Sequence, residues 1–275
     1  MKRKPARLRA CLSYLVLIAI FVNFVWPLLW LVLASISTKP AWKLVMPNPA
    51  TMENFRSIVG TPLNLRSFAN SFLMAFGEAA VALVIGLLAA YPLSRYRLRG
   101  KSKLLFSLLF LSGLPITTVM VPLYMIFFQL RIIDNLAATT LFMAAASLPN
   151  AIWMLKSFVD DVPPSLEEAA AIDGASVLQI LRRVVAPLML PGMFVVFIFN
   201  FSGTWSNFFV PFILINSLEK MPASVTIFQF FNSYGRVAYG QLAAYSILYT
   251  LPVVALYLAS QKYMSQGFTF GGAIK

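Results

Sequence analysis

The side chains best suited to recognition lie in one polar segment, residues 160–190. Ser165 and Glu168 have the three-residue spacing of a capping box, which predicts a short helix over residues 166–172. Gly174 lies where a glycine can end that helix in a left-handed conformation. The first half of the segment therefore predicts a short helix closed by a tight turn.

A second helix is predicted directly after the glycine turn. Ser176 and Gln179 repeat the capping-box spacing, and Pro187 would end or kink the helix that they begin. The whole segment is then a helix, a turn and a helix.

The first predicted helix has a shallow apolar face. Ala169 and Ala170 share that face with Leu166, and their small side chains let another surface approach closely. Three acidic residues at or near the helix ends could meet basic groups of a partner: Glu167, Glu168 and Asp173. Insertion into a partner's groove fits this pattern, and so does an interfacial linker lying on a membrane. A DNA-binding helix-turn-helix does not fit, because the unit begins with acidic residues.

The composition predicts that this segment belongs to an all-α membrane protein. Hydrophobic residues make up 60% of the 275 residues, charged residues 11%, and the mean hydropathy is +0.79. Soluble domains are about 45–50% apolar and about 25% charged. Charge-poor stretches predict six transmembrane helices within a single domain over residues 1–275, since backbone groups in lipid must pair internally. The predicted spans are 12–33, 70–92, 104–128, 136–157, 191–214 and 241–261.

The distribution of basic residues predicts that both termini are cytoplasmic. Most of the 22 lysines and arginines fall on one side of the membrane in that orientation, including those of residues 2–9 and 95–103. Because they lie beside apolar runs, the net charge of +13 indicates topology signals and no nucleic-acid partner. The 160–190 segment is then cytoplasmic, between helices 4 and 5.

Groups for covalent or metal chemistry are scarce. The chain has no histidine and one cysteine, Cys11, so we expect no metal site, disulfide or catalytic residue. Glu78 is the only acidic residue within a predicted span, and a lone carboxylate makes a poor relay for an ion-coupled secondary transporter. A membrane enzyme would need a cluster of catalytic side chains within the spans, and ATP hydrolysis would need a glycine-rich phosphate-binding loop. The sequence contains neither.

Four residues are candidates for a substrate path. Trp205, Phe208 and Asn207 could offer aromatic faces and an amide to a sugar, and Glu78 could face a cavity or a partner helix. Two alternatives remain open: helix–helix packing for the first three residues, and a paired or protonated carboxyl near one interface for Glu78.

The run of residues 168–175, Glu-Ala-Ala-Ala-Ile-Asp-Gly-Ala, resembles the EAA loop of bacterial ABC-importer permeases, especially the carbohydrate (maltose and multiple-sugar) branch. Leu181 and Ala186 depart from that pattern, which usually has an aromatic and an aliphatic residue there. Further landmarks of the branch follow in the same order along nearly the whole chain: Asn70-Ser71, residues 90–95, Gly100, residues 122–124, residues 205–208, Pro211 and the tail from Gly267 to Lys275.

The resemblance implies the type I permease fold, in which the EAA loop is the coupling helix that docks on an ATPase subunit. Five residues would carry that docking here: Glu168, Ala169, Ala170, Asp173 and Gly174. It also implies a multi-pass subunit of a bacterial or archaeal cytoplasmic membrane that moves a sugar inward. Its partners would be membrane lipid, a second homologous permease, two ATP-binding subunits holding ATP and magnesium, and an extracytoplasmic sugar-binding protein. A non-sugar solute such as glycerol-phosphate is the alternative substrate.

Overall fold

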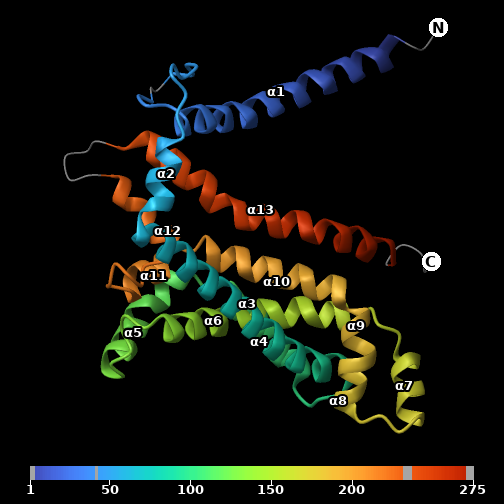
Figure 1. Ribbon diagram of the computed structural model, residues 1–275. Coiled ribbons are helices and arrows are strands. Elements are labelled where there is room, and N and C mark those ends of the chain that lie inside the picture. Colours follow the sequence, from blue (N-terminus) through green and yellow to red (C-terminus); the bar gives the residue numbers. More distant parts are fainter. Residues whose placement is uncertain (1–3, 41–42, 232–236, 271–275) are drawn as a thin grey trace. The chain divides into compact units, whose positions relative to one another are not determined.

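The computed structural model describes residues 4–40, 43–231 and 237–270, and the described chain is helical with no β-strand (Figure 1). Four stretches are long and apolar enough to cross a bilayer, or up to six if each of two bent helix pairs forms one span. The predicted all-α membrane class is thus confirmed. The α-helices are α1 (Lys4–Ser35), α2 (Glu53–Gly60), α3 (Pro62–Arg95), α4 (Lys101–Ser112), α5 (Ile116–Gln129), α6 (Leu136–Asp160), α7 (Pro164–Ile172), α8 (Val177–Ile180), α9 (Ala186–Leu188), α10 (Leu190–Trp205), α11 (Phe209–Leu214), α12 (Ala223–Thr226) and α13 (Tyr239–Phe270).

The predicted span 104–128 consists of two helices. α4 ends at Ser112, α5 begins at Ile116, and their axes are bent by 91°. Pro115 precedes α5 with an extended backbone, ψ 127°. A proline disfavours helical geometry at the residue before it and has no N–H to continue the hydrogen-bond ladder, so the helix breaks there.

The predicted span 191–214 is also divided. α10 ends at Trp205, and α11 begins at Phe209. Between them the Oδ1 atom of Asn207 accepts a hydrogen bond from the backbone N–H of Val210, in the first turn of α11, at 3.0 Å.

The described chain divides into two compact units. The first comprises Met1–Leu65 and Ile227–Leu251. In it, Asn54 donates from Nδ2 to the carbonyls of Ser35 and Ser37, both at 2.9 Å. Trp30 of α1 lies edge-on to Tyr239, with ring centroids 6.2 Å apart. These contacts join the end of α1, α2 and the start of α13.

The second unit, Arg66–Thr226 and Pro252–Lys275, contains two hydrophobic clusters. One cluster joins α3 and α6 to the helices after Gly174, through residues such as Ala82, Leu155 and Val185. The other joins α3, α5, α6 and α11, for example through Met74, Phe127 and Leu214. The first cluster includes residues of the 160–190 segment, such as Val185, and packs that segment against α3 and α6.

Asp134 ties the α5–α6 connection to the chain after α11. Its carboxylate accepts hydrogen bonds from the backbone N–H groups of Asn216 and Ser217 at 2.9 Å and from the Ser217 hydroxyl at 2.5 Å. The Lys220 ammonium lies 2.8 Å from the same carboxylate. Burial alone would raise the pKa of Asp134, but the bonds from Lys220, Ser217 and Asn216 outweigh it and hold that pKa well below its usual range.

Replacing Asp134 with asparagine is expected to lower the unfolding temperature of the purified protein. A carboxyl whose pKa is lowered by folding stabilises the fold fully above its ordinary pKa of about 4 and loses that contribution as the pH falls further. The difference from wild type, followed by tryptophan fluorescence in detergent, should therefore be largest at neutral pH and shrink in acid. Glu219→Gln is the control, because the Glu219–Arg66 ion pair is exposed. A difference that grows on acidification would contradict the assignment.

Candidate functional site

The 160–190 segment begins with α7, which starts two residues earlier than predicted. Pro163 is its N-cap, Pro164 is its first residue, and no side chain caps it. The capping box predicted for Ser165 and Glu168 is therefore wrong. Proline has the backbone φ of a first helical residue and lacks only an N–H that would be unpaired there, so the proline pair starts the helix before Ser165 can.

The turn after α7 is the predicted glycine turn. Gly174 has φ +82°, a left-handed conformation that costs glycine little. The N–H of Gly174 donates to the carbonyl of Ala171, and the N–H of Ala175 donates to that of Ala170, both at 3.0 Å. These two bonds form a Schellman motif, which fixes the direction in which the chain leaves the helix.

The second capping box is confirmed. The backbone N–H of Ser176 donates to Oε1 of Gln179 at 2.8 Å, and the N–H of Gln179 donates to the Ser176 hydroxyl at 3.4 Å. α8 then passes into a π-helix, Leu181–Val185, and into α9. The chain bends by 81° between Leu188 and Leu190, so the break follows Pro187 by two residues. Helices α7 and α8 contact each other across the turn (Figure 1).

The five predicted docking residues divide between two environments. Glu168, Ala169, Asp173 and Gly174 are exposed, whereas Ala170 is partly buried against the first hydrophobic cluster. Leu166 and Ile172 add exposed apolar area, at 45% and 86% of their surface. The exposed face therefore combines small, acidic and apolar side chains, which can enter a groove on a partner.

Glu167 does not belong to that exposed face. It is buried, and its Oε1 atom accepts a hydrogen bond from Nε of Arg95 at 2.7 Å. The hydroxyl of Tyr91 donates to its Oε2 atom at 2.9 Å. The prediction that Glu167 meets basic groups of a partner is thus wrong, because its basic group is within the chain. Tyr91 and Arg95 are four residues apart on α3, a spacing that places both on one face and could have suggested this site.

The residues proposed for a substrate path are engaged in packing and capping. Trp205 is 2% exposed, and its ring stacks on that of Phe201 with centroids 5.6 Å apart. Asn207 accepts a hydrogen bond from the first turn of α11, and Phe208 stacks on Phe212 with ring centroids 4.8 Å apart. The role of these three side chains toward a substrate stays a prediction.

Glu78 is 1% exposed and lies between helices. Its Oε1 atom accepts a hydrogen bond from the Ser147 hydroxyl of α6 at 2.5 Å. The Thr204 side chain of α10 interacts with the same carboxyl. The carboxyl therefore faces a partner helix, which was one of the two environments expected for it.

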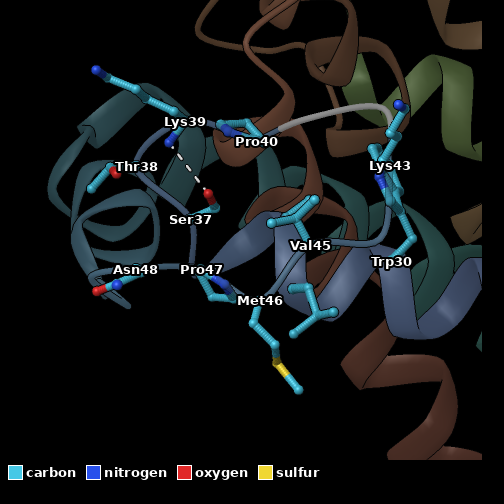
Figure 2. A pocket seen from close by; sticks show the side chains of 12 residues that line it. Trp30, Ser37, Thr38, Lys39, Pro40, Lys43, Val45, Met46, Pro47 and Asn48 are labelled. Atoms are coloured by element: carbon cyan, nitrogen blue, oxygen red, sulfur yellow. Dashed lines mark hydrogen bonds between the residues drawn. The ribbon is translucent and has the colours of Figure 1, made fainter.

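A cavity of about 260 Å³ lies in the first unit, between the end of α1 and the chain up to Asn48 (Figure 2). Its lining includes Trp30 and two lysines, whose amines extend in different directions. No group of three metal-ligating side chains occurs in the described parts of the chain. The cavity has no cluster that would do chemistry, so the 160–190 segment remains the best-defined candidate site.

Comparison with known proteins agrees with this fold. Residues 82–269 match the family described as binding-protein-dependent transport system inner membrane component, and the chain belongs to that family. It is 31% identical to the inner membrane ABC transporter permease protein YcjP of Escherichia coli, over 83% of this chain and 82% of that protein. It is 30% identical to the trehalose transport system permease protein SugB of Mycobacterium tuberculosis, over 90% and 92% of the two chains.

Among solved structures, the fold is similar to a chain of a bacterial ABC transporter involved in the import of the acidic polysaccharide alginate. The TM-score is 0.83 at 21% identity, over 96% of this chain and 99% of that chain. The protein therefore has the fold of an ABC importer permease, a multi-pass membrane subunit.

Proposed function

We propose that this chain is one permease subunit of an ATP-driven importer that carries a sugar inward across a bacterial or archaeal cytoplasmic membrane. The observation that carries the proposal is the exposed α7 face, fixed by the Schellman turn at Gly174, in a chain of this family. Relatives named for trehalose and maltodextrin transport support a sugar as the solute.

In this account residues 1–275 form one domain that crosses the membrane six times with both termini in the cytoplasm. The bent pair α4–α5 then forms one span, and α10, which follows the 81° bend, belongs to another, which brings the four unbroken candidates to six. The 160–190 segment faces the cytoplasm, where Glu168, Ala169, Asp173 and Gly174 dock on an ATPase subunit and Ala170 supports them from beneath. Basic residues that flank the spans support this orientation.

The chain itself supplies no hydrolysis. ATP and Mg²⁺ bind to two partner subunits, a second permease completes the pore, and an extracytoplasmic binding protein delivers the sugar. The substrate path is lined by four residues, which become exposed to a sugar when the helices that now pack around them separate: Glu78, Trp205, Asn207 and Phe208.

Reconstitution tests the proposal. Vesicles that contain this chain, its second permease, the ATPase subunits and the binding protein should accumulate labelled sugar only when ATP is present on the ATPase side. Ionophores that collapse proton and sodium gradients should leave uptake unchanged, because the energy comes from ATP. Uptake by this chain alone, driven by an ion gradient, would refute the proposal and restore the secondary-transporter alternative.

A further inference from the structure

The polar groups around Glu167 join three helices at one point. Arg95, the last residue of α3, donates from Nη2 to the carbonyl oxygens of Val159 and Val162 at 2.8 and 2.7 Å. The same guanidinium binds Glu167 of α7, with a shortest nitrogen–oxygen distance of 2.7 Å. Val159 lies near the end of α6, and Val162 lies in the link to α7. One side chain thus holds the ends of α3 and α6 and the start of α7.

The site is shielded from water. The side chains of Arg95 and Glu167 are 15% and 10% exposed, and Tyr91 is 6% exposed. A buried carboxylate without its cation is strongly unfavourable, and hydrogen bonds to a charged group are stronger than neutral ones. The pair therefore resists separation far more than the exposed ion pairs of this chain, such as Arg66–Glu219.

The rest of α7 is held less firmly. Its residues Leu166 and Ile172 are exposed, and among its alanines Ala170 is the one that packs on the hydrophobic cluster. Within α7, Glu167 is the buried residue. A force applied to the exposed face of α7 would therefore reach α3 chiefly through the bonds of Glu167.

We propose that Glu167, Arg95 and Tyr91 form a transmission latch, in which Glu167 is a positioning residue that passes the movement of α7 to the ends of α3 and α6. The proposal rests on the proposed function, in which α7 is moved by an ATPase subunit. It assigns different tasks to two adjacent acids: Glu168 docks on the partner, and Glu167 holds the docked helix to the pore.

Glu167→Gln tests the latch in the assembled importer. The amide has nearly the shape of the carboxylate but lacks the negative charge that pairs with Arg95. The contact between α7 and α3 should therefore weaken, while the docking face of α7 stays unchanged. We expect ATP hydrolysis to persist, and the number of sugar molecules imported per ATP hydrolysed to fall about tenfold. Arg95→Lys should show the same defect, because a single ammonium cannot reproduce the planar fork that binds Glu167 and two carbonyls together.

Asp161→Asn is the matched control. It removes the same charge from an exposed position in the same connection, and it should leave the ratio of uptake to hydrolysis unchanged. The amount of assembled complex is measured for every variant, because a purely structural role would lower assembly and leave the ratio per complex intact. Lower assembly with an intact ratio per complex, or an unchanged ratio in both Glu167→Gln and Arg95→Lys, would overturn the proposed role of the latch. Absence of ATP-driven uptake in the wild type would instead refute the proposed function.

Discussion

Replacing Gly174 with valine is expected to lower ATP-driven sugar uptake about tenfold or more. A β-branched residue at φ +82° carries backbone strain of about 1–3 kcal/mol. No atom lies within 4 Å of the position that its Cβ would occupy, so the effect comes from the backbone and not from a clash. Relief of the strain would open the Schellman turn and redirect α7.

Gly174→Asn is the control for this prediction, because asparagine tolerates the left-handed region far better than valine does. It should retain most of the uptake, although it is larger than glycine and polar. Uptake and ATP hydrolysis are measured on reconstituted complexes of equal amount. Equal losses in the two variants would show that the turn's conformation is not what matters at this position.

Replacing Gly192 with alanine is expected to destabilise the protein by about 1–3 kcal/mol, the usual cost of overpacking a filled site. Gly192 is buried at the start of α10, and an added Cβ would lie 2.4 Å from Cγ of Phe158 on α6. That atom is at the base of the ring, so a small rotation cannot relieve the contact. The unfolding temperature in detergent should fall by several degrees.

Two further variants make the Gly192 prediction specific. Gly203→Ala lies on the same helix with no atom within 4 Å of the added Cβ, and its unfolding temperature should match wild type or exceed it slightly. Gly192→Ala combined with Phe158→Leu should recover part of the loss, because the smaller side chain makes room. A stable Gly192→Ala single variant would show that α6 and α10 are packed less closely than the structure indicates.

Local sequence rules predicted the features that depend on a few neighbouring residues. The left-handed turn at Gly174 and the capping box of Ser176 and Gln179 follow from backbone preferences, and both were predicted. The start of α7 was not, because two rules competed there and the proline pair at 163–164 prevailed over the Ser165 cap.

Features that depend on tertiary contacts could not be predicted in the same way. The partner of Glu167 lies 72 residues away on α3, and nothing in the 160–190 segment itself distinguishes Glu167 from the exposed Glu168. The break between α10 and α11 lies within a long apolar run, where hydropathy alone favours one continuous helix. Which of two neighbouring acids is buried, and where a long apolar run breaks, depends on contacts with other helices, and these contacts are set by the whole fold.

We propose that the exposed face of α7 docks on an ATPase subunit at the cytoplasmic side. Cysteine labelling tests it most directly, with Ala169→Cys introduced into a Cys11→Ser background and a maleimide that does not cross membranes. We expect labelling from the cytoplasmic side alone, and strong protection once the ATPase subunits are bound. Labelling from the external side, or labelling that is equally fast with and without those subunits, would contradict it.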